Sequence, residues 1–266
     1  MKILVADPAK NITVFVLDAV EDPGERTALA RAILAERSLG AEQAGFVIPP
    51  ESSVTGYGLW RLEMAGGEFC GNAARSFGLY VARQQGRRGK INLLVSVSGT
   101  GEPVRVEADT ERSRASAEMP KPAAGAVLDY RGLSLPVLLF EGITHIIAPD
   151  LEAGRETFFA IKALAEKKFA ALPAIGVMFY DTTTRFMRPA VYVRSVDSMV
   201  FESSCGSGAA AMGVWLSREQ QNGIVRYNIA QPGGVIETEV TKKRGKISCI
   251  TIGGEVKIGE IREFAW

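Results

Sequence analysis

The sequence predicts an α+β protein made of two related halves. The stretch Cys70-Gly71-Asn72-Ala73-Ala74 resembles Cys205-Gly206-Ser207-Gly208-Ala209, and the similarity continues as far as Arg83 and Arg218. A repeat separated by half a chain length indicates two homologous halves that face one another. Patterns typical of strands outnumber those of helices and follow one another directly, whereas a doubly wound parallel sheet needs helices that alternate strictly with strands.

Each copy of the repeat predicts a buried helix that begins just after its cysteine. Small and apolar residues occupy nearly all sides of the helix up to Gly86 in the first copy and Gly223 in the second, and a helix that is apolar all round is buried. The matched Gly78 and Gly213 each cost about 1 kcal/mol relative to alanine inside a helix. We therefore expect another backbone to approach both helices closely at these positions.

The first half begins with an alternating apolar pattern at residues 11–18, which predicts a strand. Residues 22–38 have the spacing of an amphipathic helix, with a proline near the start and a glycine after the end. The remaining strands of this half are expected at residues 45–48, 58–64, 91–97 and 104–108.

We place the boundary between the halves in the Pro- and Ala-rich segment 116–125. The first domain then spans residues 1–120 and contains the Cys70 helix, and the second spans residues 121–252 and contains the Cys205 helix. We leave open whether residues from about 253 to 266 return to the first domain.

The second half has a predicted surface helix at residues 156–169 and the second buried helix after Glu202. Its strands are expected at residues 135–141, 143–148, 177–181, 187–194, 224–231, 235–242 and 246–252. Each half thus has one surface helix and one buried helix.

Composition points to a small-molecule partner. The chain has 266 residues and a net charge of +1, so it offers neither a basic field for nucleic acid nor an acidic tail. The apolar run at the start breaks at Asp7-Pro8, and no stretch approaches the roughly 18 apolar residues of a membrane span. We expect a cytoplasmic protein that binds no membrane, and we leave a homodimer open.

The three cysteines are too few for a disulfide scaffold, and none has the Cys-x-x-Cys spacing of a zinc site, so we expect no bound metal. Cys249 lies in an alternating strand pattern and is expected in the core. Cys70 and Cys205 stand at predicted helix N-termini, where unpaired N–H groups lower a thiol pKa from about 8.5 towards neutrality. The N–H groups of residues 71, 72, 206 and 207 also form ready anion sites.

These motifs resemble the paired cysteine motifs of the diaminopimelate epimerase family, which are cofactor-independent amino-acid racemases. Weaker matches occur in the right order at Asn11, at Glu42-Gln43 and at His145. The resemblance covers nearly the whole chain. It implies two pseudo-symmetric domains, each a curved, mostly antiparallel sheet around a central buried helix, with the active site in the cleft between them.

The resemblance also implies a two-base mechanism without pyridoxal phosphate or another cofactor, in which one cysteine removes the α-proton and the other returns a proton to the opposite face. The candidate catalytic residues are Cys70, Cys205, His145 and Glu202. The candidate substrate-binding residues are Asn11, Glu42, Gln43, Gly71, Asn72, Gly206 and Ser207. Fixed N–H donors are the groups that best stabilise a carboxylate as it gains enediolate charge.

The chain departs from the family where diaminopimelate epimerases grip the far end of their substrate. It has Arg61 in place of an asparagine, Ile143-Thr144-His145 in place of Asn-Pro-His, and no Glu-Arg pair before Cys205. We therefore expect another amino acid as substrate, and the second motif looks closer to the histidine racemase branch; a diaminopimelate epimerase is the alternative. Glu42, if buried, would favour a cationic substrate side chain, and Arg61 an acidic one.

Three rival functions fit parts of the sequence. The Gly-x-Gly-x-x-Ala pattern from Gly206 to Ala211 resembles a dinucleotide fingerprint but lacks the surrounding βαβ unit. A cysteine hydrolase would use Cys70 with His145, and a redox protein would join Cys70 to Cys205. A hydrolase would leave the second cysteine helix without a purpose, and we expect oxidation of the two thiols only to inactivate the enzyme incidentally, so we prefer the racemase.

Overall fold

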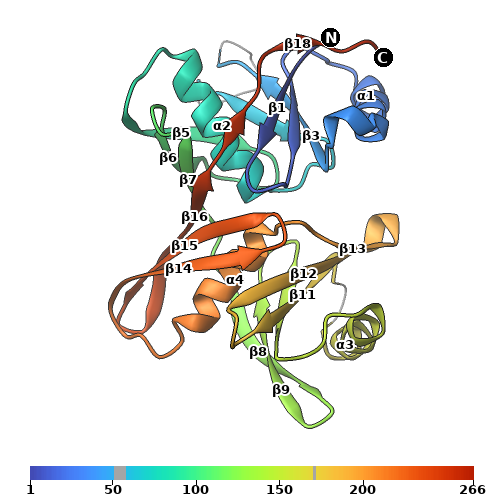
Figure 1. Ribbon diagram of the computed structural model, residues 1–266, viewed down its shortest axis with the longest axis vertical. Helices are drawn as coiled ribbons and strands as arrows, with labels where there is room; N and C mark the ends of the chain where they lie inside the picture. Colours follow the sequence, from blue (N-terminus) through green and yellow to red (C-terminus); the bar gives the residue numbers. More distant parts are fainter. Residues whose placement is uncertain (51–57, 170–171) are drawn as a thin grey trace. The chain divides into compact units, whose positions relative to one another are not determined.

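The computed structural model describes residues 1–50, 58–169 and 172–266, with the side chain of residue 196 left out of the description. The chain forms two compact units, one of Met1–Glu118 with Gly253–Trp266 and the other of Met119–Ile252 (Figure 1). The chain thus passes between the units once after Glu118 and once after Ile252.

The first unit is a mixed, mainly antiparallel sheet. In it β1 pairs with β2 on one side and with the short β17 and β18 on the other. The pairs β2–β3 and β4–β5 are parallel, and β3–β4, β5–β6 and β6–β7 are antiparallel. The strands are β1 Lys2–Asp7, β2 Thr13–Val16, β3 Gln43–Ile48, β4 Arg61–Met64, β5 Lys90–Val97, β6 Val104–Asp109, β7 Arg114–Glu118, β17 Lys257–Ile258 and β18 Arg262–Glu263.

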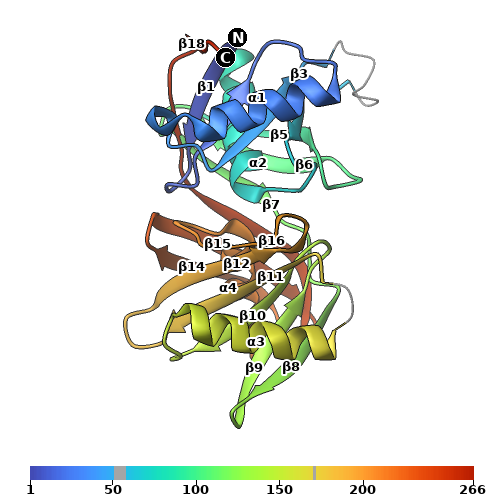
Figure 2. The ribbon, with the colours of Figure 1, turned by 90° about the vertical axis from the view of Figure 1, so that its right-hand side faces the viewer.

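Two helices pack on opposite faces of strands β1 to β3. Because successive strand side chains point to opposite faces of the sheet, each strand contributes residues to two cores. One set of strand residues, including Ile3, Val14 and Phe46, forms a core with α1 Pro23–Ala35. The alternate set, including Leu4, Phe15 and Val47, forms a core with α2 Gly71–Gln84. Figure 2 shows α1 in front of α2.

The second unit is also a mixed sheet. Its pairs β8–β9, β9–β10, β11–β12, β12–β13 and β14–β15 are antiparallel, whereas β10–β11 and the single register pair between β12 and β14 are parallel. The strands are β8 Ala124–Tyr130, β9 Leu133–Leu139, β10 Thr144–Pro149, β11 Ala174–Asp181, β12 Phe186–Val193, β13 Ser198–Phe201, β14 Gly223–Gln231, β15 Gly234–Lys243 and β16 Lys246–Glu255, which continues into the first unit.

The helices α3 Arg155–Lys168 and α4 Gly206–Leu216 complete the second unit. On β10 and β11, Ile146, Ile175 and Val177 form a core with Phe158 and Ile161 of α3. The alternate positions on these strands carry His145, Gly176 and Met178. The Met178 sulfur lies against Gly208 of α4, so this second face of the strands is the one that α4 covers.

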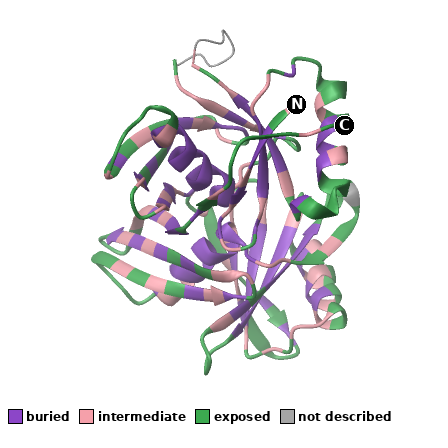
Figure 3. Cartoon of the chain, turned by 45° about the horizontal axis from the view of Figure 1, so that its top comes forward, coloured by how far each residue is buried: buried purple, intermediate pink, exposed green. Residues whose placement is uncertain are grey.

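The two helices predicted to be buried are buried. Every residue of α2 from Gly71 to Ala82 is buried, as is most of α4 (Figure 3). Close neighbours are present at both glycines as expected, but the nearest atoms belong to strand side chains and not to a backbone. A Cβ added to Gly78 would lie 2.3 Å from Val106 Cγ1, and one added to Gly213 would lie 2.4 Å from Thr238 Cγ2.

The second buried helix is shorter than predicted. It ends at Leu216 with Ser217 as its C-cap, well before Gly223. The buried Lys242 of β15 donates from Nζ to the Ser217 carbonyl oxygen at 2.6 Å. This contact satisfies a carbonyl at the helix C-terminus from outside the helix, which local sequence does not reveal.

The α+β class is confirmed, and so are the predicted surface helices. Asp22 caps α1 by accepting from the Glu25 amide at 2.7 Å, and the proline follows at the first helical position. The sequence prediction missed six strands, namely β1, β7, β8, β13, β17 and β18. The end of β7 and the start of β8 lie in the segment 116–125 that was predicted to be the boundary between the halves.

Candidate active site

Both motif cysteines are N-caps of buried helices, as the sequence predicted. Cys70 has φ −123° and ψ 113°, and Cys205 has φ −120° and ψ 112°. Each sulfur accepts a hydrogen bond at 3.4 Å from the backbone N–H three residues later, at Ala73 and at Gly208. The repeat in the sequence thus becomes a repeat of local geometry.

A directed chain of hydrogen bonds, here called the Asn11 chain, surrounds Cys70. Arg75 Nε donates to Asn72 Oδ1 at 3.1 Å, Asn72 Nδ2 donates to Asn11 Oδ1 at 3.2 Å, and Asn11 Nδ2 donates to Glu42 Oε2 at 2.7 Å. Because a guanidinium only donates and a carboxylate only accepts, the two ends determine which way both amides are turned. Arg75, Asn72 and Asn11 are buried.

The Asn11 chain reaches the thiol through an acceptor. Asn11 Oδ1 lies 3.9 Å from Cys70 Sγ and accepts from the thiol. The Gln43 side chain also hydrogen-bonds the thiol, and its Oε1 accepts from Thr13 Oγ1 at 3.5 Å. The predicted substrate-side residues Asn11 and Gln43 therefore both lie beside Cys70.

A different set of groups surrounds Cys205. Ser207 Oγ lies 3.5 Å from Cys205 Sγ and 2.9 Å from His145 Nε2. The Cys205 amide donates to Gln231 Oε1 at 2.8 Å. The Glu202 carboxylate accepts a hydrogen bond from the thiol. His145 and Glu202, both predicted from the sequence, are thus in reach of this cysteine directly or through one hydroxyl.

The predicted lowering of the thiol pKa values is wrong. Burial raises the pKa of Cys70 to about 11 from an ordinary 9.0; the Ala73 N–H lowers the pKa and the Glu68 carboxylate raises it. Burial likewise raises the pKa of Cys205 well above its ordinary value, and the Glu202 carboxylate raises it further. The helix N-termini act in the predicted direction, but desolvation of a buried thiolate outweighs them.

His145 is an uncharged residue in this structure. Burial lowers its pKa to about 3 from 6.5. Its ring lies edge-on to Phe140, with centroids 5.8 Å apart. A neutral imidazole has one donor and one acceptor nitrogen, so His145 orients neighbouring groups and does not supply a positive charge.

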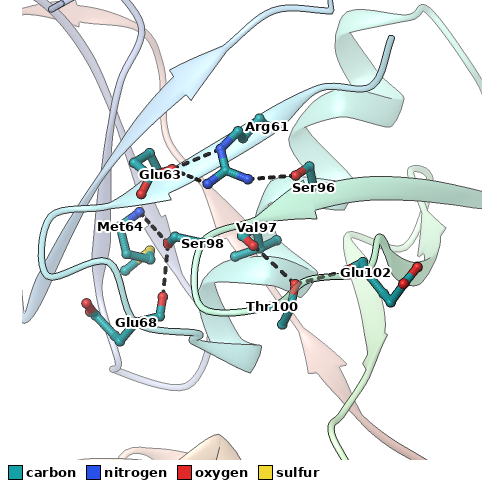
Figure 4. A network of polar contacts seen from close by, with 9 residues as sticks. All are labelled: Arg61, Glu63, Met64, Glu68, Ser96, Val97, Ser98, Thr100 and Glu102. Atoms are coloured by element: carbon teal, nitrogen blue, oxygen red, sulfur yellow. Dashed lines mark hydrogen bonds and ion pairs between the residues drawn. The ribbon is translucent and has the colours of Figure 1, made fainter. Parts of the chain in front are cut away.

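Glu42 and Arg61, the two residues considered for recognition of the substrate side chain, have surroundings that differ from the expected ones. Glu42 is exposed, so the premise that it is a buried acid is wrong; one of its oxygens is held by Asn11. Arg61 is bound within its own unit. Its Nε and Nη2 contact Glu63, and its Nη1 donates to Ser96 Oγ at 2.9 Å (Figure 4). This network ties β4 to β5.

Sequence reasoning overlooked Arg75, Gln231 and Glu68. Arg75 is a cation inside an otherwise small and apolar helix, and that contrast was the available signal. Gln231 ends β14 and reaches Cys205 only through the tertiary fold. Cys249, expected in the core, is only partly buried on β16.

The other predicted binding groups lie at the helix starts. Gly71 and Asn72 open α2, and Gly206 and Ser207 open α4. Within the described ranges, no group of three or more His, Cys, Asp and Glu side chains is placed to hold a metal ion. Among the described helices, none is long and apolar enough to cross a bilayer.

Comparison with known proteins gives a consistent result. A family model described as the histidine racemase CntK N-terminal domain matches residues 1–260. A histidine racemase of Fusobacterium nucleatum is 31% identical over 239 residues, which is 87% of this chain and 86% of the relative. A histidine racemase of Staphylococcus aureus is 25% identical over 261 residues, 95% of this chain and 90% of the relative.

The fold is that of solved racemases and epimerases. A hydroxyproline epimerase from Agrobacterium vitis, solved with bound trans-4-hydroxy-L-proline, has a TM-score of 0.67 with 11% identity and covers 98% of this chain and 91% of the epimerase. Together the relatives and the fold define an amino-acid racemase, which is an isomerase. The chain belongs to the histidine racemase family, and the resemblance to amino-acid racemases is confirmed.

Proposed function

We propose that this racemase inverts the α-carbon of histidine with Cys70 and Cys205 as its two acid–base groups. The observation that carries the proposal is the repeated geometry of the cysteines, each of which caps a buried helix with nearly the same φ and ψ. The histidine racemases of Fusobacterium nucleatum and Staphylococcus aureus support the substrate. The two compact units are proposed to be the two pseudo-symmetric domains of the predicted fold.

The proposed reaction conserves protons. One cysteine, as thiolate, takes the α-proton and becomes a thiol, while the other, as thiol, gives its proton to the opposite face and becomes a thiolate. The C–H bond breaks on one side as another forms on the other. The scheme requires that both thiols reach the same α-carbon, and general acid–base catalysis of this kind contributes about 10²–10⁴-fold.

The backbone N–H groups of Gly71, Asn72, Gly206 and Ser207 are proposed to hold the substrate carboxylate. They open two helices, where N–H groups point outward and the dipole favours negative charge. As the α-proton leaves, negative charge spreads onto this carboxylate, and fixed donors then stabilise the transition state more than the ground state.

Because the pKa values of both thiols are raised, the proposed mechanism needs groups that help to form the thiolate. Glu202 is proposed to accept the Cys205 proton, since its carboxylate already hydrogen-bonds that thiol. The substrate ammonium is the second proposed aid, because a positive charge near a sulfur favours the thiolate.

Glu42, Gln43 and Asn11 are proposed to bind the remaining polar groups of histidine. One Glu42 oxygen is held by Asn11 and the residue is exposed, so the carboxylate is oriented and accessible. An oriented carboxylate suits an imidazole N–H or an ammonium. Diaminopimelate is the alternative substrate.

Deuterium exchange tests the proposal. The reduced protein is incubated in deuterated water with single L-amino acids and LL-diaminopimelate, and loss of the α-proton signal is followed by NMR. We expect exchange with histidine that is lost in Cys70→Ala and Cys205→Ala but kept in the matched control Cys249→Ala. Normal turnover by Cys70→Ala or Cys205→Ala refutes the two-base scheme. Exchange only with diaminopimelate refutes histidine as the substrate.

A further inference from the structure

The hydroxyl of Ser207 lies between an imidazole and a sulfur. Its oxygen is 2.9 Å from His145 Nε2 and 3.5 Å from Cys205 Sγ. A hydroxyl has one hydrogen to donate, so it donates to one of these atoms and accepts from the other or from neither. Which one receives the hydrogen depends on the tautomer of His145.

The surroundings of His145 select the tautomer. His145 is fully buried, and its Nδ1 has no hydrogen-bond partner among the residues that the structure describes. A buried N–H without a partner is rarer in proteins than a buried acceptor without one. The hydrogen therefore belongs on Nε2, which donates to Ser207 Oγ and leaves Nδ1 as an unprotonated nitrogen.

The position of the imidazole is set by a glycine on the next strand. His145 of β10 is paired in register with Gly176 of β11. A Cβ at Gly176 would lie 2.4 Å from His145 Nδ1 and 2.8 Å from Cε1. The ring thus fills the space of the missing side chain, and this packing holds Nε2 towards Ser207.

We propose that His145 and Ser207 are positioning residues for Cys205, in which the imidazole Nε2–H donates to the Ser207 hydroxyl and the hydroxyl hydrogen is directed at the Cys205 sulfur. The Ser207 hydroxyl, held by His145, gives the Cys205 thiolate a second hydrogen-bond donor in addition to the Gly208 N–H. No proton is transferred between His145, Ser207 and Cys205. The inference rests on the proposed role of Cys205 in proton transfer.

Among the residues that the structure describes, no imidazole–hydroxyl pair is recorded at Cys70. The residue two positions after Cys70 is Asn72, whose amide is engaged by Arg75 and Asn11. The side-chain groups that contact the Cys70 sulfur are the acceptor Asn11 Oδ1 and the side chain of Gln43, whose hydrogen bond lowers the thiol pKa. The two half-sites therefore share a helix N-cap geometry, but an amide side chain takes the place at Cys70 that the Ser207 hydroxyl takes at Cys205.

Alkylation of Cys205 alone tests the His145–Ser207–Cys205 hydrogen bonds in the absence of substrate. In full-length protein carrying Cys70→Ser and Cys249→Ser, the rate of Cys205 alkylation by iodoacetamide is measured by mass spectrometry across pH. Below the thiol pKa this rate follows the thiolate fraction. We expect Ser207→Ala to slow alkylation about tenfold, the effect of losing a hydrogen bond to a charged group, and Ser207→Thr to retain the parent rate.

Two His145 variants test whether the imidazole donates its hydrogen bond to the Ser207 hydroxyl. His145→Leu should slow alkylation as Ser207→Ala does, with no further slowing in the double variant, whereas His145→Gln keeps a donor near the Nε2 position and should retain the parent rate. Circular dichroism confirms folding of each variant. If His145→Leu does not fold, the comparison of Ser207→Ala with Ser207→Thr still tests whether the hydroxyl stabilises the thiolate, because alanine and threonine are both accommodated in the first turn of a helix.

Several results overturn the inference. An unchanged pH–rate profile in Ser207→Ala shows that the hydroxyl does not stabilise the thiolate. A His145→Leu variant that alkylates at the parent rate, or slows equally with and without the Ser207 hydroxyl, shows that the imidazole does not act through it. Failure of α-proton exchange in the protein with all three native cysteines would instead refute the proposed function, and the alkylation result would stand.

Discussion

Arg75 Nε donates to Asn72 Oδ1 at 3.1 Å within one turn of α2, and this bond orients the polar groups beside Cys70. Because the guanidinium takes the Asn72 oxygen, the Asn72 amide nitrogen is turned to Asn11 Oδ1. Asn11 in turn offers its nitrogen to Glu42. A fully buried cation thus determines, through two amides, which atom lies next to the thiol.

Replacing Arg75 should lower stability and disorder this arrangement. Arg75→Met leaves Asn72 Oδ1 and the Glu255 carbonyl, which Arg75 Nη1 contacts at 3.2 Å, without these donors. Each buried group left unpaired costs about 1–3 kcal/mol, so we expect the free energy of unfolding to fall by about 3 kcal/mol, measured by urea denaturation. Arg83→Met on the same helix is the control and should change it by less than half as much.

Asn11→Asp should impair the Cys70 half-site at nearly unchanged volume. The new carboxylate lies against Glu42 and presents an oxygen to it in place of the Nδ2 donor. Negative charge near a thiol raises its pKa further. We expect slower alkylation of Cys70 at every pH below its pKa and reduced racemisation, while Asn92→Asp on the exposed face of β5 should leave both unchanged. Faster alkylation would contradict the assigned amide orientation.

Gly78→Ala should destabilise the protein although alanine favours helices. The helix term gains about 1 kcal/mol, but the new Cβ would lie 2.3 Å from Val106 Cγ1, and overpacking costs about 1–3 kcal/mol or more. Val106→Ala in the same chain should recover part of the loss. Gly101→Ala, where nothing lies within 4 Å, is the control. A stabilised Gly78→Ala variant, measured by thermal unfolding, would contradict this packing.

The raised pKa of Cys70 predicts a loss of stability in base. Its pKa is about 11 in the folded protein against an ordinary 9.0, so the folded state holds this proton more tightly than the unfolded state. The contribution is fully present below about pH 9 and is lost as pH rises through 11. Cys70→Ala should flatten the decline of unfolding free energy between these values, measured by urea denaturation at each pH. An equally steep decline in the variant would show that burial does not raise this pKa.

The sequence by itself determined the α+β class, the two buried helices and their starting points. These follow from local chemistry, because a run of small residues behind a cysteine and alternating apolar strand residues each act over a few neighbouring positions. The positions of Asn11, Gln43 and His145 could be predicted only through the family resemblance, whereas Glu202 is predicted from its place three residues before Cys205. The structure brings each of them to a cysteine within its own unit.

Only the tertiary structure decided the properties that depend on burial and on distant partners. The thiol pKa values rise because desolvation outweighs the helix N-terminus. Arg61 is bound to Glu63 and Ser96, and α4 ends early where Lys242 from β15 reaches Ser217. A residue's charge and helical spacing can be read from the sequence, but its solvent exposure and its hydrogen-bond partner depend on strands that lie far away along the chain.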